Sequence, residues 1–300
     1  MFMKNSKNIN IVFSVDWEGR ELDLKNLNAM KAFREDYPHI PILQFLNAAY
    51  FTKPKADIDQ TKKLIESVLL PIDEIGLHIH GWKSQFETCG VPFRNSPSFN
   101  TGGEIFAGEF DLDIGHDIPI SEYTTDELVK VIKHSKDLFN KIGWGIPKNF
   151  RCGGWISKPH VLKALELEGV IGDYSAVPCK FLDGKRKSNF LHDWLFPLWS
   201  DITPLTQPYK IGNIIEWPNN GCLADYVSGE EMLNTFKQNW EEFQKSDAQE
   251  WYVSFGFHQE TANKFLINIR EAIKFIESYC QMEKIPHSYP QLPLKPLKIG

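Results

Sequence analysis

The chain has 300 residues, of which 42% are hydrophobic and 24% charged, a balance that is typical of a globular protein and excludes a disordered one. Its formal net charge is −6, with no block of Lys or Arg, so the sequence offers nothing that would attract nucleic acid. The first apolar run, at 11–15, is too short for a signal peptide, and no later run has the length of a membrane span. The five cysteines are widely spaced and predict reduced thiols rather than disulfides. We therefore expect a cytoplasmic protein without a membrane segment.

Short apolar runs alternate with amphipathic segments along the chain, a pattern that predicts a mostly parallel α/β sheet. The expected strands lie, in chain order, at 9–15, 40–46, 75–80, 149–151, 170–174, 213–217 and 251–257. The expected helices lie at 57–70, 124–142, 158–168, 228–244 and 260–283. Thr124 and Glu127 have the spacing of a capping box, and Gly143 ends the helix that they begin.

No repeat or long linker divides the chain, so we expect a single domain over residues 1–300. The segment at about 83–123 is long, weakly periodic and rich in turn-forming residues, and it predicts a functional insertion or a lid. The tail from about 286 contains four prolines and predicts an extended path along the surface.

Ionisable side chains stand at the C-terminal ends of four of the expected strands. These are Asp16 with Glu18, His78 with His80, Arg151, and His258. Residues i and i+2 of an extended chain share a face, so each of the two pairs points in one direction. In an α/β barrel the C-terminal ends of the strands form one rim, which is where active sites are built.

Each of these features has a plainer interpretation. Asp16 and Glu18 could simply solvate a turn, and His258 could be a core histidine. His78 and His80 are stronger evidence, because two imidazoles on one strand face can chelate a divalent ion. Their joint occurrence at four strand ends is what favours a functional site. His116, within the expected insertion, stays undecided at this point.

Several common catalytic motifs are absent from the sequence, and their absence excludes the enzyme classes that depend on them. The sequence contains no G-x-S-x-G elbow, no Walker P-loop, no H-E-x-x-H and no zinc-finger spacing. Gly143 and Gly145 lack the third glycine of a dinucleotide fingerprint and follow a helix instead of a strand. Serine acyl-enzymes, P-loop NTPases and Rossmann dehydrogenases are therefore excluded.

Five segments resemble, in order and spacing, the five motifs of the polysaccharide deacetylases, the NodB-like carbohydrate esterase family 4. They are FSVDWEG, EIGLHIHGW, FRCGGW, GDYSAVP and FGFH. The resemblance extends over roughly residues 8–275 and is to a divergent branch. It implies a distorted (β/α)₇ barrel, one divalent metal ion, and hydrolysis of N-acetyl or sometimes O-acetyl groups on a carbohydrate. Zn²⁺ is the metal expected, with Co²⁺, Ni²⁺ or Mn²⁺ as alternatives.

The resemblance implies a set of metal ligands, from which this sequence departs twice. Glu18 falls on the metal-binding acid, although the family usually has an aspartate one residue earlier. His78 falls on the first metal histidine, but the second histidine position, four residues on, is Trp82. His80 is the residue that could replace the second metal histidine. If His80 does not bind the metal, His116 is the next candidate.

The same resemblance implies four catalytic residues. Asp16 falls on the general base, Arg151 on the arginine that steadies it, and His258 on the histidine that acts as general acid. Asp173 falls in the fourth motif. Flat aromatic rings stack on sugar units, so Trp82, Trp155 and Trp217 are the predicted substrate-binding residues, although core packing is the more common role for a tryptophan.

Three functions remain open. The first is a metal-dependent deacetylase acting on an N-acetylated carbohydrate. The second is a hydrolase of a small cyclic amide or imide, since relatives of this fold open C–N bonds outside sugars. The third is a carbohydrate-binding protein that has lost the metal, which the missing histidine at Trp82 makes conceivable.

Overall fold

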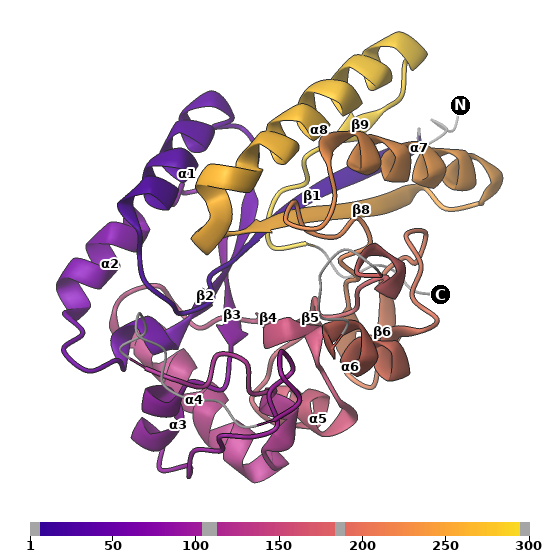
Figure 1. Ribbon diagram of the computed structural model, residues 1–300. Helices are drawn as coiled ribbons and strands as arrows, with labels where there is room; N and C mark the ends of the chain where they lie inside the picture. Colours follow the sequence, from indigo (N-terminus) through magenta and orange to yellow (C-terminus); the bar gives the residue numbers. More distant parts are fainter. Residues whose placement is uncertain (1–6, 104–112, 184–189, 295–300) are drawn as a thin grey trace.

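The structure is a computed structural model that describes residues 7–103, 113–183 and 190–294. A nine-stranded sheet forms its centre, in the order β6-β7-β5-β4-β3-β2-β1-β8, with β9 also paired to β1 (Figure 1). The strands are β1 Asn8–Asp16, β2 Ile42–Asn47, β3 Glu74–Ile79, β4 Asn149–Cys152, β5 Gly172–Asp173, β6 Tyr209–Ile211, β7 Ile214–Glu216, β8 Glu250–His258 and β9 His287–Ser288. Every pair is parallel except the hairpin of β6 and β7.

The sheet curls until its two ends are joined by the segment that follows β7. Asn219 donates its backbone N–H to the carbonyl of Ala176 near β5, at 2.8 Å. Two residues later, Gly221 donates to Ser254 of β8 at 2.9 Å, and Leu223 forms an isolated parallel bridge with Gly256. An irregular strand therefore closes the curl, and the predicted distorted barrel is confirmed.

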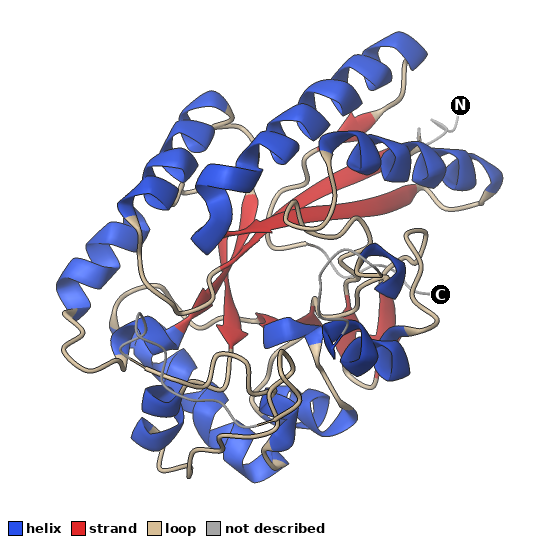
Figure 2. Cartoon of the chain, in the orientation of Figure 1, coloured by secondary structure: helices blue, strands red, loops and turns tan. Residues whose placement is uncertain are grey.

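Helices cover the outside of the curled sheet (Figure 2). They are α1 Leu24–Asp36, α2 Ile58–Glu66, α3 Lys83–Thr88, α4 Thr125–Lys141, α5 Pro159–Leu167, α6 Phe190–Trp199, α7 Gly229–Lys245 and α8 Ala262–Glu283. The capping box of Thr124 and Glu127 begins α4 as predicted, and Ser228 with Glu231 forms a second one on α7. Among the described helices, none has the length and apolar character needed to cross a membrane.

The main core lies between the sheet and the helices, and a smaller cluster fills the inside of the barrel. This inner cluster contains Val12, Leu43, Phe45, Tyr174, Trp217, Tyr252 and Leu294. Leu294 belongs to the C-terminal tail, which we expected to run along the surface. The described part of the tail instead pairs with β1 through β9 and then buries Leu294, because its apolar side chain covers an otherwise open end of the inner cluster.

Candidate metal and catalytic site

The strand register brings the predicted site residues to one rim. Asp16 lies opposite His258 across the pairing of β1 and β8, and His78 lies opposite Arg151 across the pairing of β3 and β4. The expected neighbourhood of β1 and β8 in one barrel is therefore confirmed. A cavity of about 160 Å³ opens at this rim, and Asp16, Glu18 and His258 are among the residues that line it.

Glu18 occupies the centre of this site, surrounded by imidazole nitrogens. Its Oε2 lies 2.7 Å from Nε2 of His80 and 2.5 Å from Nε2 of His116. Its Oε1 lies 3.4 Å from Nε2 of His78 and 3.5 Å from Nε2 of His258. Burial alone would raise the pKa of this carboxyl, but the surrounding imidazoles, with the hydrogen bond from His116 among them, hold it well below its ordinary value. Glu18 is therefore a charged carboxylate.

His78 and His80 are both held in the tautomer that a metal ligand needs. Nδ1 of His78 lies 2.8 Å from the carbonyl oxygen of Arg151, and Nδ1 of His80 lies 2.6 Å from the carbonyl oxygen of His116. Because a carbonyl can only accept, each Nδ1 carries the proton and donates it. Each Nε2 then keeps its lone pair, and the two Nε2 atoms face one another at 3.1 Å. Burial lowers the pKa of His80 to about 4, which keeps this ring neutral.

This donor set fits a divalent cation. The ligand atoms of Glu18, His78 and His80 lie within 4.8 Å of one another, as two nitrogens and one oxygen. Two neutral imidazoles that point their lone pairs at each other repel unless a positive charge lies between them, and the Glu18 carboxylate adds negative charge at the same place. A borderline-soft ion such as Zn²⁺ takes this combination of imidazole and carboxylate ligands.

His116 comes from the predicted insertion and reaches the same carboxylate. Its ring stacks on that of His80, with centroids 4.1 Å apart, and its Nδ1 lies 2.6 Å from Oδ1 of Asp117. Burial lowers the pKa of His116, but its bonds to Asp117 and Glu18 outweigh this and raise it to about 9. Residue 116 thus supports the site twice, by holding Glu18 with its ring and His80 with its carbonyl. The sequence pattern left this histidine undecided.

Asp16 is held by a buried arginine. Nη1 of Arg151 donates to Oδ1 of Asp16 at 2.6 Å and to the hydroxyl of Ser14 at 2.9 Å, while its Nε donates to the carbonyl of Tyr174. Arg151 is fully buried and its guanidinium lies over the ring of Phe45. A charge-assisted bond of this kind fixes the orientation of the carboxylate.

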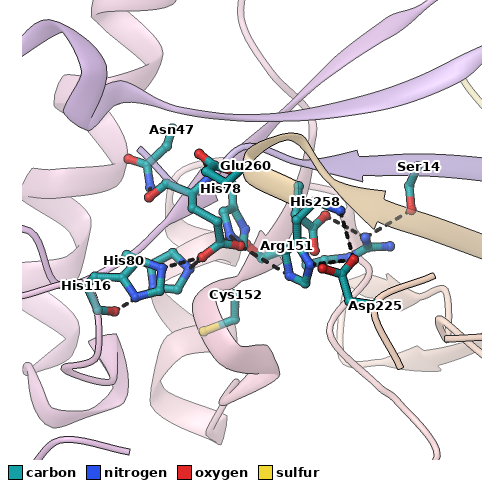
Figure 3. Close-up of polar contacts among 12 residues, drawn as sticks. Ser14, Asn47, His78, His80, His116, Arg151, Cys152, Asp225, His258 and Glu260 are labelled. Atoms are coloured by element: carbon teal, nitrogen blue, oxygen red, sulfur yellow. Dashed lines mark hydrogen bonds and ion pairs between the residues drawn. The ribbon is translucent and has the colours of Figure 1, made fainter. Parts of the chain in front are cut away.

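Asp225 holds His258 on the other side of the cavity (Figure 3). Its Oδ2 lies 3.0 Å from Nδ1 of His258, and it also accepts hydrogen bonds from the hydroxyl of Thr261 and the backbone of His258. Burial lowers the pKa of His258, yet the charge of Asp225 raises it to about 10. Sequence analysis missed Asp225, because it lies in an irregular segment whose approach to β8 no local pattern reveals.

Glu260 joins the site from the turn after β8. Its Oε1 accepts the backbone N–H of Glu18 at 3.0 Å and the hydroxyl of Tyr50 at 2.6 Å. Burial and the charge of Glu18 raise the pKa of Glu260 to about 7. This second missed carboxyl fixes the loop that carries Glu18, since it binds that loop's backbone directly.

Comparison with known proteins places this geometry on a known fold. No family model and no curated protein sequence matches the chain. Among solved structures, it is similar to a protein of Mycobacterium smegmatis described as a polysaccharide deacetylase, with 11% identity, a TM-score of 0.51, and coverage of 99% of this chain and 97% of that one. The chain has the polysaccharide deacetylase fold. It is equally similar to Puue allantoinase, with 10% identity, a TM-score of 0.51, and coverage of 97% and 89% of the two chains.

Not every residue that the resemblance singled out reaches the cavity of this polysaccharide deacetylase fold. Asp173 is buried away from it, where it accepts hydrogen bonds from Ser157 and Ser175. The expectation of a catalytic role is not matched by its position, because β5 ends below the rim and turns its carboxyl into the protein.

Only one of the three predicted substrate-binding tryptophans lines the cavity. Trp82 is fully buried, and its Nε1–H donates to the carbonyl oxygen of Glu18 at 2.8 Å, so it has no exposed face on which a sugar could stack. Trp217 packs in the inner cluster against Tyr174, away from the cavity. Both predictions therefore need correction. Trp155 does line the cavity, next to Tyr226 with ring centroids 5.6 Å apart.

Proposed function

We propose that the protein is a metal-dependent hydrolase that removes an N-acetyl group, or an O-acetyl group, from a carbohydrate. The observation that carries this proposal is the arrangement around Glu18: His78 and His80 face it from one side, and Asp16 and His258 flank it on the other. Glu18, His78 and His80 would hold the ion. When bound, a divalent ion activates a water molecule and polarises the carbonyl to be attacked.

Asp16 is the proposed general base. One of its carboxylate oxygens lies within 4.8 Å of an oxygen of Glu18 and a ring nitrogen of His258, so it can take a proton from a water molecule in the cavity. Arg151 keeps the carboxylate turned toward the cavity, and Ser14 fixes the arginine in turn. General base catalysis of this kind contributes roughly 10²–10⁴-fold.

His258 is the proposed general acid. Its Nδ1 is bonded to Asp225, so the Nε2–H is the proton that faces the cavity. Because Asp225 raises the pKa of the ring to about 10, His258 is protonated at neutral pH and can give a proton to a departing amine.

The lining of the cavity carries charges of both signs. Asp16, Glu18, Asp225 and Glu260 face Arg20 and the rings of His116 and His258, whose pKa values are raised to about 9 and about 10. The rings of Trp155 and Tyr226 provide an apolar surface for the sugar.

The second candidate function is hydrolysis of a small cyclic amide or imide. It is supported by the structural similarity to an allantoinase, which has the same TM-score as the similarity to the deacetylase. Opening a cyclic amide would use the same ion, base and acid. Both reactions release a carboxylate in the cavity, so its charges do not separate them. The five segments of the sequence that resemble the deacetylase motifs are the reason to prefer deacetylation.

The test compares both substrates on one preparation. The full chain, loaded with Zn²⁺ or Co²⁺, should release acetate from chitooligosaccharides, and Asp16→Asn should release at least about 10²-fold less with the ion of Glu18, His78 and His80 still bound. Ring opening of a cyclic ureide without acetate release would favour the second candidate. A chain that binds these sugars but no divalent ion would contradict both and return the role to carbohydrate binding.

A further inference from the structure

Two groups of potential metal ligands in this cavity share one residue. The first is the set of Glu18, His78 and His80, and the second consists of Asp16, Glu18 and His258. The ligand atoms within each set lie no more than 4.8 Å apart. Glu18 therefore stands between two clusters of donors, one on each side of its carboxylate.

The first cluster approaches both oxygens of Glu18, and the second cluster approaches one of them, Oε1. Oε2 is the oxygen closest to His80, at 2.7 Å, while Oε1 is the one that approaches His258, at 3.5 Å. His78 approaches Oε1 from the first cluster, at 3.4 Å. Figure 3 shows His80 on one side of the site and His258 with Asp225 on the other. A carboxylate in this position can bind one cation with each oxygen, which is how carboxylates bridge ions about 3.5–4 Å apart.

His258 has the support that metal-binding histidines usually have. Such rings donate their second N–H to a carboxylate or a backbone carbonyl, which orients the ring and strengthens the ligand. Nδ1 of His258 lies 3.0 Å from Asp225, just as Nδ1 of His78 is held by the carbonyl of Arg151. A cation that displaced the Nε2 proton of His258 into solvent would thus meet a lone pair directed toward Glu18.

Asp16 can complete the second cluster without losing its arginine. Arg151 donates to Oδ1, and a carboxylate offers about four lone-pair positions over its two oxygens. Asp16 and Asp225 also bring two negative charges to this side of Glu18 that the first cluster does not use, against the positive charge of Arg151.

We propose that Glu18 bridges two divalent-cation sites, and that a second ion binds between Asp16, Glu18 and His258. This inference rests on the proposed function for its first ion, at Glu18, His78 and His80. The second ion occupies the lone pairs of the proposed base and acid, so its binding slows hydrolysis. Excess metal therefore inhibits hydrolysis by binding to the proposed catalytic residues, Asp16 and His258.

The stoichiometry of metal binding tests this proposal without any substrate. Titration of the metal-free full chain with Co²⁺, followed by calorimetry and elemental analysis, should give two ions per chain, one weaker than the other. His258→Gln should bind a single ion with the affinity of the stronger site, whereas His80→Gln should weaken the stronger site at least about 10-fold. Electron paramagnetic resonance should report magnetic interaction between the two Co²⁺ ions in the wild type only.

His134→Gln is the matched control, because His134 lies on α4, outside both clusters, and its replacement should leave two ions bound. Saturation of the wild type at one ion, unchanged in His258→Gln, would overturn the second site while leaving the proposed function intact. Two ions in both wild type and His258→Gln would also overturn it. A chain that binds no ion at all would overturn the second site together with the proposed function.

Discussion

Glu18 and Glu216 are both buried carboxyl groups near the ends of strands, and their neighbours give them opposite properties. Burial raises the pKa of each, but the surrounding histidines bring Glu18 well below its ordinary value. Glu216 faces another carboxyl group, Asp173, and its pKa lies well above the ordinary value. Burial alone therefore does not decide whether an acidic residue is charged, because the charges beside it also shift its pKa.

The consequences for function follow from the same contrast. A charged Glu18 among imidazole nitrogens can bind a cation at the cavity. A protonated Glu216 can only donate its proton to Asp173, whose oxygens also accept from Ser157 and Ser175. The Asp173 and Glu216 pair is therefore part of the scaffold below the cavity, and the site depends on Glu18.

The largest effect is expected for Glu18→Gln. The amide keeps the size of the side chain but removes its charge, so bound metal and activity should be lost together. The loss of metal affinity should exceed the roughly 10–100-fold that removing an outer partner costs. Equilibrium dialysis with Zn²⁺ measures it, and tight metal binding by this variant would contradict the central place given to Glu18.

Asp225→Asn should have the next largest effect, and it should depend on pH. The charge of Asp225 holds the pKa of His258 at about 10, against burial, so without it the ring loses its proton at lower pH. The alkaline limb of the kcat/KM profile should therefore move toward neutral pH, with about 10- to 100-fold lower activity at pH 8. An unchanged alkaline limb would show that another group sets it.

Trp82→Phe should affect stability more than substrate binding. The replacement leaves the buried carbonyl of Glu18 without one of its donors and opens a small void, at a cost of about 2 kcal/mol in the free energy of unfolding. KM should stay within about twofold. Trp155→Phe is the comparison, because Trp155 lines the cavity and its replacement should raise KM. If KM rises in Trp82→Phe and not in Trp155→Phe, then Trp82 contacts the substrate and this prediction is wrong.

Glu216→Gln should have the smallest effect, since the amide N–H can donate to Asp173 in place of the carboxyl proton. The pKa of Glu216 is raised in the folded state, so its contribution to stability is complete below its unfolded value of about 4.5 and is lost as pH rises through the folded value. Glutamine cannot ionise, and the variant should lose less stability than the wild type between pH 5 and pH 9. Urea unfolding across this range measures it.

The exposed Glu35 gives the control for this comparison. Glu35→Gln, on the outer face of α1, should leave the pH dependence of unfolding unchanged. If Glu216→Gln falls more steeply with pH than the wild type, then Glu216 is charged in the folded protein and the contrast with Glu18 is wrong.

The strands that carry the site could be predicted from local sequence patterns. Apolar runs that end in Asp16, His78, Arg151 or His258 are local patterns, and parallel strands necessarily present their C-terminal ends on one rim. The helix α4 was equally predictable, because its capping box and its glycine stop are read from adjacent residues. The helix α1 was not predicted, although its apolar residues repeat every three positions.

The polar groups that complete the site could not be predicted in this way, because they depend on contacts between distant parts of the chain. His116 and Asp225 lie far along the chain from Glu18 and His258, in segments without regular periodicity, and they meet them through contacts that no local pattern encodes. The position of Trp82 could not be predicted either. The motif spacing aligns it with a metal histidine of the family, whereas in the structure it is buried and donates a hydrogen bond to the carbonyl oxygen of Glu18. A strand pattern fixes the direction of a side chain, whereas its partners are fixed by loops whose paths depend on the whole packed fold.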